Sequence, residues 1–303
     1  MPDFSLLKQS LLACSANVMQ RIEDLLSCNG NDSPILNSMR YSALSIGKRI
    51  RPFLLIATAN VFAIPTSKCL NIAVAIEFIH TYSLIHDDLP AMDNDDFRRG
   101  KPTNHKQFGE AMAILAGDAL LTYAFELLSL PESHSDAHIR CELIKIIAKA
   151  SGFLGMVGGQ AIDILSKHNS LTSEEIINMH RLKTGELFMA SAECGAVIGR
   201  ATNEERQAIR HYARDLGIAF QIQDDIIDYS GQSFGKVNLD ETRHVTNNKG
   251  KDQINIVDKI GLEQAKQHLQ ALKHQAKQHL GIFGIKANLL NDLVDFVVMD
   301  DNH

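Results

Sequence analysis

Apolar residues recur at three- and four-residue spacing along nearly the whole chain, and no segment shows a convincing alternation of apolar and polar residues. This pattern predicts an all-α fold. The predicted helices cover residues 3–27, 34–46, 50–63, 67–90, 107–130, 137–165, 172–199, 204–230, 261–281 and 286–299. Several follow residues suited to capping, namely Ser67, Thr172 with Glu175, and Thr202 with Glu205.

The segments between these helices are short and polar. The clearest breaks fall at residues 29–34, 130–136 and 231–251. None has the length of a linker, and no repeat or low-complexity tract appears. Because 67–90 and 107–130 are apolar on most sides, they should be buried at the centre. We therefore expect a single domain over 1–303, a large bundle of about ten helices around a central cavity.

Two acidic clusters end two of the apolar helices. HDDLPAMDNDDFRRGKPTNH (86–105) contains five aspartates, and QIQDDIIDY (221–229) places Asp224 and Asp228 one turn apart. An acidic run is usually a solvated helix end. Two runs on core helices, however, would repel each other unless a cation held them. Oxygen ligands of this kind suit Mg²⁺, which usually shares its coordination shell with substrate phosphates.

A calcium-binding EF-hand is the other familiar aspartate-rich loop. Counted from Asp87, it would need glycine at the sixth position and glutamate at the twelfth. Met92 and Arg98 stand there instead, so the EF-hand interpretation fails.

Basic residues follow or precede each acidic cluster. They are Arg98 and Arg99, then Lys48, Arg49 and Arg51 of GKRIRP (47–52), Lys183 of KTG (183–185) and Lys236 of GK (235–236). Guanidinium forks and lysine ammonium groups match phosphate oxygens. A single surface cation is usually just solvated, but this set, interleaved with metal-type carboxylates, predicts a diphosphate site.

Composition narrows the class of function. The chain is 45% apolar and 22% charged with a net charge of −6, which argues against nucleic-acid binding. Its five cysteines are scattered and form no zinc motif, as expected of free thiols in a reducing compartment. The N-terminus fails as a signal peptide, and the apolar segment near 110–130 is interrupted by Asp118 and Glu126. We expect a cytoplasmic protein with no membrane span.

Six motifs together resemble those of the trans-isoprenyl diphosphate synthases, and the chain is most similar to the bacterial farnesyl diphosphate synthases of that family. In order, they are GKRIRP, HTYSLIHDDLPAMDNDDFRRGKPTNH, LAGDALL (115–121), GMVGGQAIDI (155–164), MHRLKTGEL (179–187) and FQIQDDIID (220–228). The resemblance runs from about residue 34 to 230.

The resemblance implies roles for individual residues. It implies that Mg²⁺, as three ions bridged to an allylic diphosphate, is bound by Asp87, Asp88, Asp93 and Asp224, with Asp225 and Asp228 in support. Contacts to the allylic diphosphate are implied for Arg98, Lys183, Thr184, Gln221 and Lys236, and contacts to isopentenyl diphosphate for Lys48, Arg51, His80 and Arg99. A lone histidine on an apolar helix is more often a core residue, but His80 shares a helical face with Asp87.

The implied reaction is the condensation of isopentenyl diphosphate with dimethylallyl or geranyl diphosphate. Tyr82 and Ser83 lie about one turn below Asp87, where a growing prenyl chain would meet the Tyr82 ring. By family analogy, this aromatic floor and the spacing from Asp87 to Asp93 indicate a fifteen-carbon product. The same analogy implies a homodimer.

Alternatives remain open. A geranylgeranyl or geranyl diphosphate synthase would use the same site with a different floor. A terpene cyclase would not need Lys48 and Arg51 and usually has more aromatic residues than 6%. A non-catalytic partner subunit would lack aspartates that are intact here. The loop after the second cluster, which closes over the substrate in the family, departs from the family pattern: Gln232 replaces an acidic residue and Asn238 stands near an expected glycine.

Overall fold

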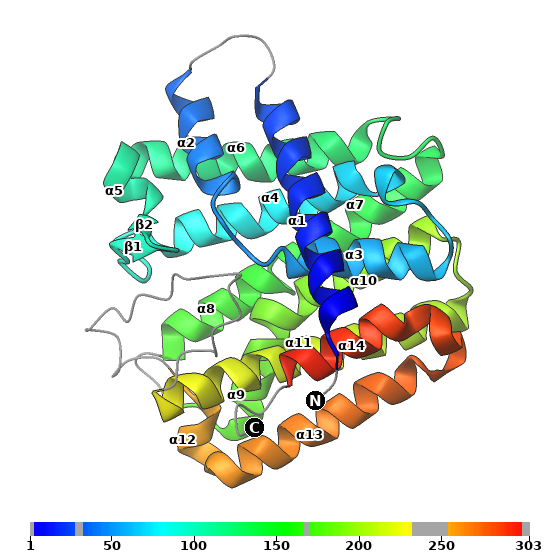
Figure 1. Cartoon of the computed structure of the whole chain (residues 1–303). Helices are drawn as coiled ribbons and strands as arrows, with labels where there is room; N and C mark the ends of the chain where they lie inside the picture. The colour runs from blue at the N-terminus through cyan, green and yellow to red at the C-terminus, as the bar shows by residue number, and fades with distance from the viewer. Residues whose placement is uncertain (1–2, 28–32, 167–169, 232–253, 299–303) are drawn as a thin grey trace.

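The structure, a computed structural model, describes residues 3–27, 33–166, 170–231 and 254–298 (Figure 1). These residues form an almost wholly helical molecule, which confirms the predicted all-α class. The longer helices are α1 (Ser5–Leu26), α2 (Pro34–Ala43), α3 (Ile50–Val61), α4 (Leu70–Asp87), α6 (Glu110–Ser129), α7 (Ala137–Ser151), α8 (Met156–Ser166), α9 (Ser173–His180), α10 (Glu186–Ile198), α11 (Asn203–Ser230), α13 (Leu262–His279) and α14 (Asn288–Val297). Short turns of helix are η1 (Thr66–Lys68), α5 (Asn104–Phe108), η2 (Arg181–Gly185), α12 (Ile256–Ile260) and η3 (Gly281–Ala287).

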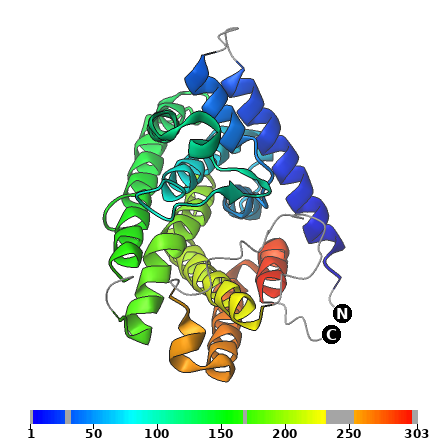
Figure 2. The same ribbon diagram turned by 90° about the vertical axis from the view of Figure 1, so that its left-hand side faces the viewer.

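Helix α4 lies at the centre of the bundle, as its apolar sequence predicts. It packs along α6 on one side and against α3 on the other, while α1 crosses over it (Figures 1 and 2). From Asn71 to Ile79 every residue of α4 is buried. Deep burial of this helix gives the aspartates at its end a rigid support.

A second group of helices continues the bundle below α4 in Figure 1. Helix α10 packs against both α3 and α11, and α11 packs against α13. Gly195 of α10 makes the α3 contact possible, because a Cβ there would lie 2.4 Å from the carbonyl oxygen of Leu55. The second acidic cluster therefore ends a helix that is separated from α4 by one helical layer.

Glycines divide two segments that the periodicity predicts as single helices. The predicted helix 137–165 is broken between α7 and α8, where Gly152 ends α7. The predicted helix 107–130 is broken at Gly109, whose φ of +86° is a conformation that favours glycine. Apolar periodicity continues across both breaks, so the pattern alone does not reveal them.

Two of the three predicted caps are confirmed. Thr172 and Thr202 each form a capping box with the glutamate three residues later. The prediction for Ser67 is wrong, since that residue lies within the short turn η1 and α4 begins only at Leu70.

A small β-hairpin follows α4 and was not predicted. Strands β1 (Phe97–Arg98) and β2 (Lys101–Pro102) pair in antiparallel register. Both turn residues have positive φ, 52° at Arg99 and 74° at Gly100, as a two-residue type I′ turn requires. Two residues per strand are too few to show an alternating pattern.

Helix α6 is, among the described residues, the helix long and apolar enough to cross a membrane by length and composition. It nevertheless packs along α4 and against α2 and α7 as a helix of the bundle. Asp118 and Glu126 on its exposed side are solvated, as the interrupted apolar pattern suggests.

Candidate active site

The first acidic cluster forms a compact loop at the end of α4. The backbone N–H of Asp93 donates to the carbonyl of Asp87 (2.9 Å), and that of Asp95 donates to the carbonyl of Asp88 (3.2 Å). Asp88 is buried, and Arg98 of the hairpin donates from Nε to both of its carboxylate oxygens, at 2.8 and 2.9 Å. The hairpin thus brings Arg98 back onto the cluster that precedes it in sequence.

Asp87 faces helix α8 and the turn η2. Its carboxylate accepts a hydrogen bond from Nε2 of Gln160. Burial raises the pKa of Asp87 to about 6, the charge of Asp93 adds to the rise, and the ammonium group of Lys183 opposes it. A half-buried carboxylate beside a second one is the electrostatic setting in which a bound cation is favoured.

Lys183 connects the two acidic regions. It lies on η2, a π-helical turn between α9 and α10, and its Nζ is 2.6 Å from Oδ2 of Asp163 on α8. Burial lowers the pKa of Lys183, but the charges of Asp87 and Asp163 outweigh this effect, and the net shift is upward. The side chain therefore stays cationic at the centre of the site. π-helical turns inside α-helices are frequent at functional sites.

The second acidic cluster lies on the last turns of α11. Thr184 of η2 donates its hydroxyl to Oε1 of Gln221 (3.0 Å), and this bond joins the two predicted phosphate contacts across the site. Asp224 is half-buried, whereas Asp228 is exposed. The η2 turn, packed between α8 and α11, thus carries Lys183 and Thr184 beside both clusters.

Asp225 of this cluster has a different environment. Its Oδ2 accepts from the backbone N–H of Ile256 (2.9 Å), and its carbonyl accepts from the side chain of Asn255 (2.8 Å), both at the start of α12. Burial raises the pKa of Asp225 to about 7, the Ile256 N–H opposes the rise, and Asp224 and Asp228 add to it. This carboxylate therefore ties α12 to α11.

Of the residues predicted for the second substrate, Arg51 of α3 and Arg99 of the hairpin lie close to His80 of α4. Nη1 of Arg51 on α3 lies 3.3 Å from Nε2 of His80, and Arg99 donates to the hydroxyl of Ser45 (3.1 Å). Burial, followed by the charges of Arg51 and Arg99, lowers the pKa of His80 well below its ordinary value. Its imidazole is therefore neutral among guanidinium groups. Lys48 is half-buried in the loop just before α3.

The predicted floor residues also lie on α4. Tyr82 is buried, and its ring makes an edge contact with His86 at a centroid distance of 5.8 Å. Ser83 is half-buried and donates its hydroxyl to the carbonyl of His80 (2.8 Å). Lys236, together with the loop positions Gln232 and Asn238, lies outside the described residues.

The carboxylates fit Mg²⁺ by chemistry rather than as a ready-made cage. In the described part of the chain, no three acidic, imidazole or thiol groups converge as a metal site. The carboxylates of Asp87, Asp88 and Asp93 offer only oxygen ligands; in this structure Gln160 donates a hydrogen bond to Asp87, and the ammonium group of Lys183 partly compensates its charge. Such an open, oxygen-only set matches a metal that takes part of its shell from substrate phosphates.

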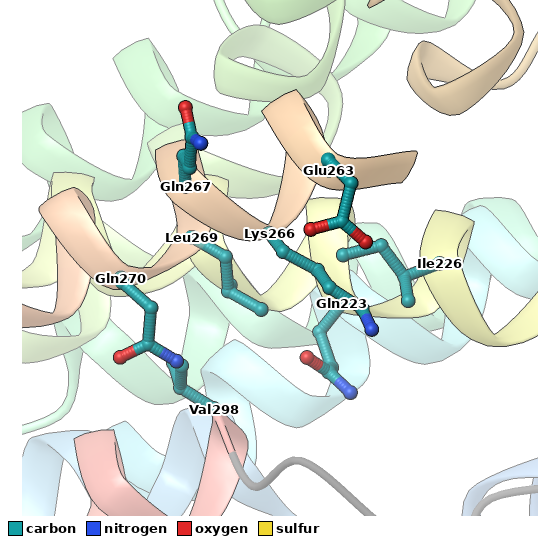
Figure 3. A pocket seen from close by; sticks show the side chains of 8 residues that line it. All are labelled: Gln223, Ile226, Glu263, Lys266, Gln267, Leu269, Gln270 and Val298. Carbon is teal, nitrogen blue, oxygen red and sulfur yellow. The ribbon is translucent and has the colours of Figure 1, made fainter. Parts of the chain in front are cut away.

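A separate pocket lies between α11, α13 and the end of α14, with a volume of about 290 Å³. Figure 3 shows its lining, to which Gln223 and Ile226 contribute from α11 and Glu263 and Lys266 from α13. None of the predicted site residues lines it. This pocket is therefore not the central cavity that the sequence predicts.

Comparison with known proteins supplies the family. The model of the polyprenyl synthetase family matches residues 32–249, well over half of the chain. The chain belongs to this family. It is 47% identical over 225 residues to the farnesyl diphosphate synthase of Geobacillus stearothermophilus, covering 74% of this chain and 73% of that protein. It is 41% identical to geranylgeranyl pyrophosphate synthase 4 of Arabidopsis thaliana, covering 89% and 71% respectively.

The fold comparison agrees. The crystal structure of an FPP/GFPP synthase from Zymomonas mobilis superimposes with a TM-score of 0.86 at 40% identity, covering 97% of this chain and 99% of that one. Membership confirms that the chain is a prenyltransferase of isoprenoid biosynthesis and that its relatives are generally Mg²⁺-dependent.

Sequence reasoning missed three side chains near the site, Gln160, Asp163 and Glu77, and it counted Arg49 among the phosphate-matching cations although the structure pairs its guanidinium with Glu77. Gln160 and Asp163 lie within the quoted GMVGGQAIDI motif, where their polar character on a glycine-rich helix start was a usable signal. Arg49 and Glu77 form a buried ion pair between α3 and α4. A lone glutamate inside the apolar run of α4 was the signal for that pair.

Proposed function

We propose that the protein condenses isopentenyl diphosphate with dimethylallyl or geranyl diphosphate to form farnesyl diphosphate. One observation carries the proposal. Helix α4 presents a carboxylate cluster at Asp87 and a cationic cluster around His80, seven residues and about 10 Å apart along the same helix. Two diphosphates, one held through metal and one held directly by cations, would lie side by side at that separation.

The assigned roles follow from chemistry. Asp87, Asp88, Asp93 and Asp224 are proposed to hold three Mg²⁺ ions, which when bound supply positive charge to the leaving diphosphate. The allylic diphosphate is proposed to contact Arg98, Lys183, Thr184, Gln221 and Lys236, and isopentenyl diphosphate is proposed to contact Lys48, Arg51, His80 and Arg99. In this structure Arg98 pairs with Asp88 and Lys183 with Asp163, and each cation has further N–H donors for a diphosphate.

The chain's residues support each step of the condensation. The allylic C–O bond breaks and its electron pair leaves with the diphosphate, whose negative charge Lys183 and Arg98 stabilise. The double bond of isopentenyl diphosphate then forms the new C–C bond, and a proton passes from the resulting cation to the departing diphosphate. Neutral His80, whose Nε2 accepts from Arg51, is proposed to lie against isopentenyl diphosphate without adding charge near the cation.

Product length is proposed to be set at Tyr82, with Ser83 beside it. The buried Tyr82 ring lies about one turn below Asp87 and would stop a chain of fifteen carbons. A geranylgeranyl diphosphate synthase is the second candidate, because the Arabidopsis relative with that name is almost as similar as the Geobacillus one.

We further propose a homodimer that acts in the cytoplasm. Helix α6 leaves Ile114 and Leu115 exposed, and the segment after α7 exposes Phe153 and Leu154, which makes an apolar surface suited to a second copy. The described cysteines are all free thiols, as in a reducing compartment.

The test is a condensation assay. Purified protein is incubated with Mg²⁺, labelled isopentenyl diphosphate and either allylic starter, and the dephosphorylated products are sized. A fifteen-carbon product that EDTA abolishes is expected. Twenty-carbon products would favour the second candidate, and condensation insensitive to EDTA would contradict the metal assignment.

A further inference from the structure

Arg49 stands between two residues assigned to isopentenyl diphosphate, Lys48 and Arg51, but its own guanidinium is bonded to Glu77 and to two backbone carbonyls. Its backbone has φ 47° and ψ 38° at the N-cap of α3, a left-handed conformation that non-glycine residues rarely adopt. Its side chain is fully buried. A strained backbone combined with a buried charge indicates that surrounding contacts hold this residue in place.

The guanidinium group of Arg49 joins three segments of the chain. Nη1 donates to Oε1 of Glu77 on α4, and Nη2 donates to the carbonyls of Ala43 (2.8 Å) and Ser45 (2.7 Å) at the end of α2. The hydroxyl of Ser45 in turn accepts from Arg99 of the hairpin. The group therefore links α4, the loop carrying Lys48, and the hairpin carrying Arg99.

Glu77 lies one helical turn before His80 on α4, and only 2% of its side chain is exposed. Its negative charge acts on Arg51. Burial lowers the pKa of Arg51 to about 10, and the charge of Glu77 partly opposes this fall. The guanidinium groups of Arg49, Arg51, Arg98 and Arg99 all lie close enough to His80 to lower its pKa, so mutual repulsion among them would otherwise separate them. The buried carboxylate of Glu77 compensates part of this positive charge.

We propose that the buried Arg49–Glu77 ion pair is a positioning device for isopentenyl diphosphate, holding the Lys48–Arg51 loop and Arg99 against His80 in a geometry ready for the second diphosphate. The inference rests on the proposed function of those four residues. Stability alone is a poor explanation for the pair, because buried ion pairs are often no better for folding than apolar residues of similar volume.

The test replaces Arg49 by lysine. Arg49→Lys keeps the charge paired with Glu77 but cannot bridge a carboxylate and two carbonyls at once. We expect KM for isopentenyl diphosphate to rise about tenfold or more, with KM for the allylic substrate and kcat within about threefold of wild type. Titration calorimetry with isopentenyl diphosphate alone should show the same loss of affinity.

The matched control is Arg206→Lys. Arg206 also bridges two acceptors, Glu142 (2.7 Å) and Glu193 (2.9 Å), but it lies on α11 away from α4 and the hairpin. A similar change in both KM values for Arg49→Lys, or an unchanged KM for isopentenyl diphosphate, would overturn the proposal.

A second variant tests the proposal in case Arg49→Lys does not fold. If Arg49→Lys does not accumulate as folded protein, Glu77→Asp is measured in the same way, because it keeps both charges and shortens only the reach of the carboxylate. The same selective rise in KM is expected, and its absence overturns the proposal. Failure of the proposed function is distinguishable, since wild-type protein would then neither bind isopentenyl diphosphate nor condense it.

Discussion

Individual carboxylates at this site occupy different electrostatic environments although they are adjacent in sequence. Asp88 is neutralised by the guanidinium of Arg98, whereas Asp87 has an amide partner and an elevated pKa. Likewise Asp224 is half-buried, while Asp225 is buried and bonded to the start of α12. Residue type therefore determines which groups are present, and local contacts give adjacent aspartates different partners and different pKa values.

Asp225 should make the metal-free protein less stable as pH rises. Its pKa is raised to about 7 in the folded state, so between about pH 4 and 7 the folded protein binds more protons than the unfolded chain, and the free energy of unfolding falls with increasing pH. Asp225→Asn removes this contribution while an amide oxygen can still accept from Ile256. We expect the variant to gain stability over wild type in urea unfolding at pH 7.5 but not at pH 4.5.

The control for that measurement is Asp258→Asn, which changes an exposed aspartate on α12. Its effect on the free energy of unfolding should stay within about 0.5 kcal/mol at both pH values. An Asp225→Asn effect that is the same at both pH values would contradict the assignment of a raised pKa.

Tyr82 tests the assignment of the chain-length floor. Tyr82→Ala removes the buried ring one turn below Asp87 and should let products longer than fifteen carbons form. Tyr82→Phe keeps the ring and should leave the product distribution unchanged. Chromatography of the dephosphorylated products measures both, and an unchanged spectrum for Tyr82→Ala would place the floor elsewhere.

At the scale of elements, the π-helical turn η2 is held between two close helix contacts. A Cβ on Gly159 of α8 would lie 2.3 Å from the backbone nitrogen of Lys183, and a Cβ on Gly217 of α11 would lie 2.9 Å from Cα of Gly185. These glycines let α8 and α11 approach the turn that carries Lys183 and Thr184. The position of both predicted phosphate contacts therefore depends on helix packing as well as on their own residue types.

Gly159→Ala should displace η2. We expect a loss of about 1–3 kcal/mol in stability from the steric clash and a fall in kcat/KM for the allylic substrate of about 100-fold. Gly281→Ala is the matched control, because a Cβ there has no atom within 4 Å. Steady-state kinetics and thermal unfolding separate the two effects, and full activity in Gly159→Ala would show that the contact does not position Lys183.

At the scale of the whole molecule, the exposed apolar residues lie in more than one region. Ile114, Leu115, Phe153 and Leu154 belong to α6 and the segment between α7 and α8, whereas Ile285 of η3 is also highly exposed. The proposed homodimer uses the α6 surface, because Ile114 and Leu115 are adjacent on a long helix of the bundle, whereas Ile285 belongs to a short turn.

Leu115→Asp should weaken the proposed dimer. A charge in the centre of an apolar interface loses its hydration, so sedimentation velocity should show a shift from dimer toward monomer. Ile285→Asp places the same charge on a different exposed apolar residue and should leave the oligomeric state as in wild type. A wild-type protein that sediments as a monomer, or a dimer unaffected by Leu115→Asp, would contradict this interface.

The amino-acid sequence by itself determined the helical class, the buried position of α4 and the chemical character of the site. Apolar periodicity is local information, and the charges of aspartates, arginines and lysines follow from residue type alone. The two acidic clusters, the neighbouring cations and the family resemblance could therefore all be found along the chain.

Only the tertiary structure decided which groups meet. The Gln160–Asp87 bond spans 73 residues of sequence and the Arg49–Glu77 pair spans 28, so neither follows from local pattern. The breaks at Gly109 and Gly152 and the π-helical turn at Lys183 depend equally on packing against other helices, which overrides periodicity. Contacts between distant segments form because burial of several helix faces is optimised together, and no single segment contains that information.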